Sequence, residues 1–215
     1  QTQSGAMNEA FADISGAMVE RLNWKIGEDI VKPGVFPTGC LRDMSNPHNG
    51  GSSLSDPGYQ PGNVSEMYTG SQDNGGVHIN SGIINFAFYK YATAVGKDKG
   101  EKTFFRTLFN YLTRSSQFID CRLAVIQSAK DLYGDGSAEV NAAKTAFDEV
   151  GIAAGTGGNY QNQLPVNPGQ DYIISHDLEP GATYSLYVSP TTPTTFQPIS
   201  QTILLNKPSI VDDGS

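Results

Sequence analysis

The sequence predicts a mainly α-helical protein in which five helices form a bundle-like lobe with a long ordered loop region, followed by a small β-rich segment. Three observations predict this class. Apolar residues recur at helical spacing in five separate segments, residues 23–80 lack that spacing and are rich in Gly, Pro, Asn and Ser, and the composition changes sharply at Ala153. We therefore expect a helical domain over residues 1–152, a linker over 153–162 and a β-rich tail over 163–215.

The first predicted helix spans residues 6–22, where apolar side chains form a single stripe. The members of this stripe are Met7, Ala10, Phe11, Ile14, Ala17, Met18 and Leu22. Residues 23–80 then form a long loop with short strands, and loops of this length inside a domain tend to be functional or held in place by ions.

Four more helices are predicted after this loop. One begins at Ser81 and stops at Gly96, a residue type that commonly ends helices. The same spacing predicts helices over residues 101–113, 120–133 and 137–150, with Ser137 as an N-cap and Gly134 and Gly151 as stops. Short connections between these helices favour one compact bundle.

The tail has a different character. Residues 154–159 have the Gly-rich composition of a linker, and beyond them three stretches separated by Pro and Gly indicate strands, at residues 172–175, 183–189 and 201–205. Residues 207–215 are similar to the start of a blade in TolB-like β-propellers. A truncated propeller-like segment and a sandwich-like or irregular β segment both stay open.

Composition narrows the classes of function. With 17% charged residues, 24 Gly and 12 Pro, the chain is typical of a loop-rich secreted, extracellular protein. A net charge of −8 argues against nucleic acid or an anionic membrane as a partner, because both need a basic face. The sequence has no apolar run of about 18 residues, so it predicts no transmembrane helix. The first residues contain neither Met nor a signal peptide, so we expect a fragment of a longer protein.

The two cysteines, Cys40 and Cys121, fit no C-x-x-C spacing, which argues against a cysteine zinc site. In a secreted protein they could form a disulfide. The sequence does not give their separation in space, so a disulfide and two free thiols are both open alternatives.

An acidic stripe runs along the first predicted helix. Glu9, Asp13 and Glu20 lie at positions i, i+4 and i+11, which places them on one face opposite the apolar stripe. Taken by itself, this spacing favours an ordinary solvated face. A functional role requires something cationic for the stripe to meet.

A second feature is the segment Asp73-Asn74-Gly75-Gly76-Val77-His78-Ile79-Asn80-Ser81-Gly82. It puts an imidazole between a Gly-rich turn and a helix, with an acid five residues earlier that could orient the ring. The glycines do not follow a strand in a nucleotide-binding pattern. His48 and His176 stand alone among loop residues, where a structural role is the simpler interpretation.

Four blocks of this chain resemble the thermolysin family of zinc endopeptidases in order and approximate spacing. They cover residues 5–14, 24–30, 41–45 and 73–84, and the resemblance extends from about Ser4 to Val150. The last block is highly specific. The resemblance implies a hydrolase that cleaves peptide bonds with a zinc ion.

The same resemblance implies a role for each matching polar residue. Glu9 matches the third zinc ligand, and Asp13 matches the carboxylate that orients a zinc-binding histidine. Arg42 matches the arginine that binds the substrate carbonyl and braces the primed-side pocket. His78, oriented by Asp73, matches the imidazole that donates a hydrogen bond to the tetrahedral oxyanion.

Apolar positions also match. Ile26, Ile30 and Leu41 correspond to the pocket that accepts a bulky hydrophobic side chain on the primed side of the substrate. The expected substrates are therefore peptides or proteins cleaved before such residues.

The sequence contains no H-E-x-x-H, the helix that supplies two zinc-binding histidines and the general base. We expect that helix in a missing N-terminal half, with which this chain shares the zinc. The chain alone should bind zinc weakly and be inactive. A non-catalytic binding or assembly module derived from a peptidase lobe is the alternative function.

Calcium is a second cofactor that the resemblance implies, and here the sequence departs from the family. Glu20 and Glu28 match calcium-binding acids, but Asn23 and Lys25 occupy two positions where acids are expected. Two alternatives follow: calcium held by the remaining acids, or an ion pair between Lys25 and Glu20 or Glu28 in its place.

Overall fold

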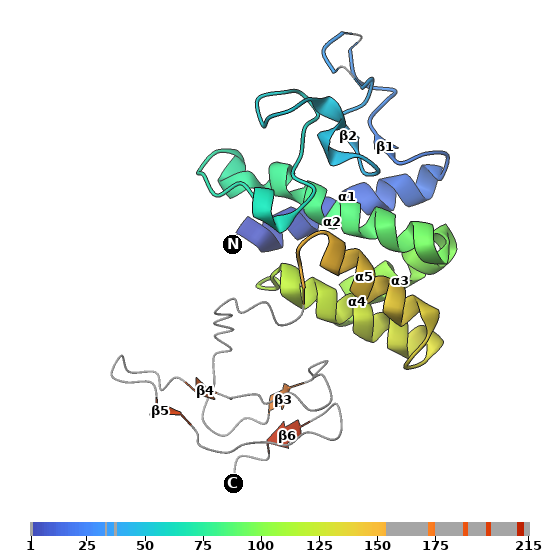
Figure 1. Ribbon diagram of the computed structural model, residues 1–215, viewed down its shortest axis with the longest axis vertical. Helices are drawn as coiled ribbons and strands as arrows, with labels where there is room; N and C mark the ends of the chain where they lie inside the picture. Colours follow the sequence, from blue (N-terminus) through green and yellow to red (C-terminus); the bar gives the residue numbers. More distant parts are fainter. Residues whose placement is uncertain are drawn as a thin grey trace. The chain divides into compact units, whose positions relative to one another are not determined.

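The computed structural model (Figure 1) describes residues 2–153 other than 33 and 37, together with the backbone of four short strands further along the chain. The chain divides into two compact units, Gln1–Thr156 and Gly157–Ser215. Each unit is described by itself. Among the described residues, no helix combines the length and the hydropathy that crossing a bilayer requires.

The first unit contains the predicted five helices, which confirms the mainly α-helical class. They are α1 (Thr2–Glu20), α2 (Asp73–Val95), α3 (Lys97–Asn110), α4 (Phe118–Tyr133) and α5 (Ala138–Glu149). Between α1 and α2 the long loop carries a two-stranded antiparallel sheet, β1 (Lys25–Ile26) and β2 (Arg42–Asp43), and two 3-10 turns, Pro47–Gly50 and Val64–Glu66. In Figure 1 this loop region lies on one side of α1 and α2, and α3 to α5 lie on the other.

The core is centred on Phe104 of α3, which is fully buried. Its ring centroid lies 4.8 Å from Phe88 and 5.9 Å from Tyr91 on α2, 5.8 Å from Phe11 on α1 and 6.5 Å from Phe147 on α5. Aromatic rings bury large apolar areas and dominate core energetics. This cluster therefore ties four of the helices together, and truncating Phe104 to Ala should cost about 3–5 kcal/mol.

The end of α1 differs from the prediction. The helix stops at Glu20, and Leu22, predicted in the apolar stripe, is 84% exposed. Arg21 takes a positive φ of 63° and turns the chain. Lys97 Nζ donates to the carbonyl oxygens of Arg21 at 2.8 Å and Asn23 at 3.2 Å, and lies 4.2 Å from the Trp24 ring centroid. A cation at the carbonyl end of a helix stabilises that end, so this contact fixes where α1 stops.

The other helix ends follow the sequence more closely. The predicted stops Gly96, Gly134 and Gly151 follow α2, α4 and α5, with positive φ of 90°, 90° and 79°. The Ser137 side chain accepts from the backbone N–H of Val140 as the predicted N-cap of α5. Four helices start earlier than predicted: α1 at Thr2, α2 at Asp73, α3 at Lys97 and α4 at Phe118. The first turn of α3 is made of charged and glycine residues, so it carries no apolar spacing to detect.

The two cysteines are free thiols and both are buried. The disulfide alternative is therefore wrong for this fold. Burial raises the pKa of the Cys121 thiol far above its ordinary value, which keeps that side chain unreactive in the folded state.

In the second unit the structure describes only short strands. β3 (Tyr172–Ile174) pairs antiparallel with β6 (Ile210–Asp212), and β4 (Tyr187–Val188) pairs antiparallel with β5 (Gln197–Pro198). β3 and β4 fall within two of the predicted strands. The predicted linker beyond residue 153 and the predicted strand at 201–205 lie outside the described residues.

Candidate functional site

Only part of the acidic stripe of α1 is a solvated face. Asp13 is only 7% exposed, although Glu9, one helical turn earlier, is partly exposed and Glu20 is exposed. A buried carboxylate needs compensation from hydrogen bonds or a counter-charge. Asp13 therefore indicates a site with specific polar partners rather than an ordinary solvated surface.

Two donors from different elements hold Asp13. Arg42 Nη1 on β2 donates to Asp13 Oδ1 at 2.9 Å, and Asn85 Nδ2 on α2 donates to Asp13 Oδ2 at 2.8 Å. Burial raises the pKa of Asp13, and the Arg42 charge and the Asn85 hydrogen bond oppose that shift. The short β1–β2 ladder, which pairs Ile26 with Arg42, positions the guanidinium over α1.

His78 follows a left-handed turn at the start of α2. Asn74, Gly75 and Gly76 have φ of 52°, 84° and 83°, a conformation that glycine adopts without strain and Asn tolerates. The backbone N–H groups of Gly75 and Gly76 both donate to Gln72 O at 2.9 Å. The regular helix starts only after this turn, and α2 begins at Asp73 rather than Ser81 because its bounds include the turn.

Asp73 orients His78 through both its oxygens. Oδ1 lies 2.6 Å from the ring Nδ1, and Oδ2 accepts from the backbone N–H of His78 at 2.7 Å and of Ile79 at 3.0 Å. Burial acts to raise the pKa of Asp73, but the bonds from His78 and Ile79 outweigh it and the pKa lies below its ordinary value. The sequence prediction that Asp73 orients the ring matches this geometry.

The ring of His78 meets the acidic stripe. Its Nε2 lies 3.3 Å from Glu9 Oε2, and the imidazole is half exposed. The structure therefore brings Glu9, Asp73 and His78 together, and Asp13 with Arg42 lies one turn along α1 from Glu9. The Arg42 guanidinium, paired with Asp13, is the cation that the acidic stripe required.

Residues that the sequence analysis missed hold the turn in place. The buried Asn80 side chain bonds both backbone groups of Tyr68, accepting from its N–H at 2.8 Å and donating to its carbonyl at 2.9 Å. Gln60 Nε2 donates to His78 O at 2.6 Å. No local sequence pattern predicts the roles of these residues, because the hydrogen-bond partner of each comes from another part of the chain.

The three predicted pocket residues gather around Gly27. Leu41 N donates to Ile26 O at 2.8 Å. A Cβ built on Gly27 would lie 3.2 Å from Leu41 Cβ and 3.4 Å from Ile30 Cγ1. Ile30 is 79% exposed. An exposed apolar side chain beside two half-buried ones provides surface that a hydrophobic group could cover.

Comparison with known proteins decides the family. The model of the thermolysin metallopeptidase α-helical domain matches residues 1–152. The chain belongs to the thermolysin metallopeptidase family. Members of this family are zinc-dependent hydrolases, and the family predicted from the sequence is confirmed.

Individual relatives agree. The chain is 46% identical over 167 residues to bacillolysin of Bacillus caldolyticus and to thermolysin of Alicyclobacillus acidocaldarius, covering 71% of this chain and 29% of each relative. The fold is similar to that of the protealysin precursor of Serratia proteamaculans, with a TM-score of 0.62, 31% identity, and coverage of 71% of this chain and 51% of that one. The chain thus spans less than a third of the length of these curated relatives.

The residues present fit part of the zinc site of the thermolysin family. Glu9 offers one carboxylate beside an imidazole, and carboxylate oxygen is an accepted zinc ligand. Among the described residues, no three His, Cys, Asp or Glu side chains converge as a metal-binding group. Within residues 2–153, Glu9 thus offers a single carboxylate ligand beside the His78 ring.

In the region where the resemblance implies calcium, the described residues do not form the Lys25 ion pair that was one of the two alternatives. Among the described side chains, Lys25 forms no ion pair with Glu20 or Glu28. Instead Asn23 donates through Nδ2 to Glu28 Oε1, and Asn23 Oδ1 accepts from the Lys25 backbone N–H at 2.6 Å. Asn23 thus holds the chain between residues 23 and 28.

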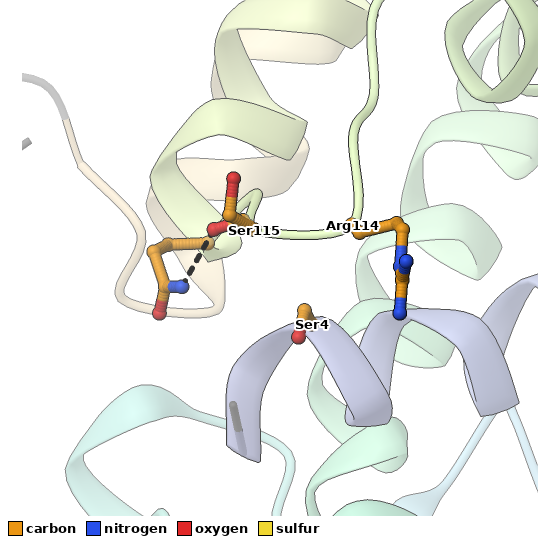
Figure 2. A pocket seen from close by; sticks show the side chains of 4 residues that line it. Ser4, Arg114 and Ser115 are labelled. Atoms are coloured by element: carbon orange, nitrogen blue, oxygen red, sulfur yellow. Dashed lines mark hydrogen bonds between the residues drawn. The ribbon is translucent and has the colours of Figure 1, made fainter. Parts of the chain in front are cut away.

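The hollows found on this lobe lie elsewhere. One is lined by Ser4 at the start of α1 and by Arg114, Ser115 and Gln117 between α3 and α4 (Figure 2), where Gln117 Nε2 donates to Ser115 O at 2.9 Å. An adjoining hollow adds Met7, Phe11, Leu108 and Leu112. Neither hollow contains a residue predicted for the site, and the side chains of His78 and Glu9 are both partly exposed.

Proposed function

We propose that this chain forms the C-terminal half of a secreted zinc metalloendopeptidase, which hydrolyses peptide bonds before bulky hydrophobic residues. The observation that carries the proposal is the approach of His78 Nε2 to Glu9 Oε2 at 3.3 Å, with Asp73 behind the ring and Asp13 beside the glutamate. Family membership supports the same conclusion. Arg42 pairs with Asp13, and no packing requirement explains these five polar groups at these places.

Each group has a role in this proposal. Glu9 would hold the zinc through a carboxylate oxygen, and Asp13 would accept the N–H of a zinc-binding histidine, on the ring nitrogen that does not bind the metal. When bound, zinc supplies a Lewis acid that acidifies a water molecule and polarises the peptide carbonyl. The other zinc ligands and the general base would come from H-E-x-x-H in an N-terminal half, which is the partner we propose.

The remaining groups act on the substrate. His78, with Nδ1 held by Asp73, presents Nε2 as a donor toward the oxyanion that develops on the peptide carbonyl. Arg42 uses one of its five N–H donors on Asp13, which leaves others for the substrate carbonyl. Ile26, Ile30 and Leu41 would form the primed-side pocket that selects a bulky apolar residue.

This division of the site makes the chain alone inactive, because one carboxylate does not hold zinc tightly. A role for calcium remains part of the proposal for Glu20 and Glu28. Calcium would add to the stability of the loop that carries the pocket residues, without a part in the chemistry.

The test is reconstitution. Joining this chain to an N-terminal half that carries H-E-x-x-H should give zinc-dependent cleavage of a peptide before Leu or Phe, with no cleavage by either half alone. Arg42→Lys should raise KM and lower kcat, since a point charge replaces a planar fork. A reconstituted protein that holds its fold but cleaves no peptide would contradict the proposal.

A further inference from the structure

We propose that Asn85 is a positioning residue of the metal site: its buried amide fixes the Asp13 carboxylate in the orientation that a zinc-binding histidine needs. This inference rests on the proposed function. It adds a residue on α2 to a set that the sequence placed on α1 and on the loop region.

The geometry points to Asn85 because it completes the restraint on Asp13. Asn85 is fully buried, and its Nδ2 lies 2.8 Å from Asp13 Oδ2. Arg42 holds the other oxygen at 2.9 Å. With one donor on each oxygen, from two different elements, the plane of the carboxylate is fixed. A carboxylate has about four acceptor sites, so capacity remains for a third donor such as an imidazole N–H.

The second half of the Asn85 amide has no partner. Asn85 Oδ1 is buried and accepts no hydrogen bond from any described residue. A buried unpaired acceptor destabilises a fold, and an apolar side chain of similar size would avoid that cost. Asn80, on the same helix, differs because it uses both ends of its amide on Tyr68. The contribution of Asn85 therefore lies in its contact with Asp13.

A purely structural role for Asn85 makes a different prediction. If the amide only joined α1 to α2, its loss would lower stability and would weaken zinc binding no more than any comparable buried bond. If it positions Asp13, zinc affinity falls by more than the loss of a comparable buried hydrogen bond elsewhere would cause. Mutation of residues that hold metal ligands in place through hydrogen bonds typically weakens metal affinity about 10- to 100-fold, so an effect of about that size is expected here.

The experiment compares Asn85→Leu with Thr103→Val in this chain joined to the H-E-x-x-H half. Thr103 on α3 is the control: it is buried, and its Oγ1 lies 3.1 Å from the hydroxyl of Tyr91, which is on α2 like Asn85. Zinc dissociation constants are measured by competition with a fluorescent chelator. Urea unfolding is measured on the zinc-free proteins. We expect about 10- to 100-fold weaker zinc binding in Asn85→Leu only, with no greater loss of stability than in Thr103→Val.

Unchanged zinc affinity in folded Asn85→Leu would overturn the inference, as would equal weakening in both variants. If Asn85→Leu does not fold, Asn85→Ala is measured by the same two criteria. Glu9→Gln separates this inference from the proposed function. If Glu9→Gln leaves zinc affinity unchanged, the proposed function fails; if Glu9→Gln weakens binding and Asn85→Leu does not, only the role of Asn85 fails.

Discussion

Asp73 binds His78 twice, through the ring Nδ1 at 2.6 Å and through the backbone N–H at 2.7 Å. One carboxylate thus fixes the start of the helix and the orientation of the imidazole that the helix carries. Because the ring is held on its Nδ1 side, its Nε2 is directed toward Glu9. The predictions below depend on this arrangement.

Replacing Asp73 with Asn should disturb the ring of His78, because an amide cannot accept through both of its terminal atoms as the carboxylate does. We expect kcat/KM of the reconstituted peptidase to fall about 10- to 100-fold, as for other groups that orient a functional histidine. Asp56→Asn is the matched control, since Asp56 also accepts two backbone N–H groups, in an exposed loop. Equal activity in the two variants would contradict the role of Asp73.

Removing the imidazole should affect catalysis and leave the fold intact. We expect His78→Ala to lose about 2–4 kcal/mol of transition-state stabilisation, the range seen for an oxyanion donor. The ring is half exposed and packs no core, so the free energy of unfolding should change little. Steady-state kinetics and urea unfolding on the same preparation check this. A binding or assembly module would instead keep its partner affinity and show no peptidase activity to lose.

The left-handed turn should be sensitive to any side chain at Gly76. An alanine there has an unfavourable φ of +83°, and its Cβ would lie 2.7 Å from Tyr68 Cδ1 and 2.9 Å from Asn80 Nδ2. Gly136 has a similar φ of +79° but open space around it. Gly136→Ala should therefore cost only about 1–2 kcal/mol for the backbone, and Gly76→Ala should cost more. Equal losses of unfolding free energy would show that the contacts of the turn do not matter.

Acid should weaken the turn through Asp73. Its pKa in the folded state lies below the ordinary value of 3.8. A carboxyl group of this kind stabilises the fold fully above its unfolded pKa, and the stabilisation is lost as pH falls through the folded pKa. Unfolding free energies measured between pH 5 and about pH 2 should therefore fall more steeply in the natural protein than in Asp73→Asn. Parallel curves for the two proteins would contradict this assignment.

Free thiols give a prediction that separates this fold from a disulfide-linked one. Cys40 and Cys121 are buried and unlinked, so a reducing agent should leave the thermal midpoint unchanged. A thiol reagent should react with both cysteines after unfolding, and slowly or not at all before it. Loss of stability on reduction would require a disulfide.

Much of the helical lobe could be predicted because the residues of its core recur at helical spacing along the chain. Met7, Phe11, Ile14 and Met18 are buried on α1 as their spacing predicts. The prediction that Leu22 belongs to the buried stripe is wrong because α1 ends before it, where Lys97 binds the chain. Lys97 is distant in the sequence, so local spacing could not predict that contact. The early start of α2 was missed for a related reason, since left-handed turns carry no apolar period.

The site shows the same division. Spacing alone placed Glu9 and Asp13 on one face of a helix, but it gave no reason to connect them with His78, and only the family resemblance did so. The structure brings Glu9 and His78 within 3.3 Å. Asn85 and Gln60 could not be found from the sequence, because a buried amide in a helix or loop acquires its role from a partner on another element. Their contacts exist only in the folded lobe.

Zinc stoichiometry tests the central claim most directly. This chain, joined to an N-terminal half that carries H-E-x-x-H, is dialysed against zinc, freed of excess metal and analysed for metal and protein content. The proposed function predicts about one zinc ion per complex, with most of that zinc lost in Glu9→Gln, because the third ligand is removed. A complex without zinc, or one whose zinc content is the same in Glu9→Gln, would contradict the assignment of Glu9 and with it the peptidase function.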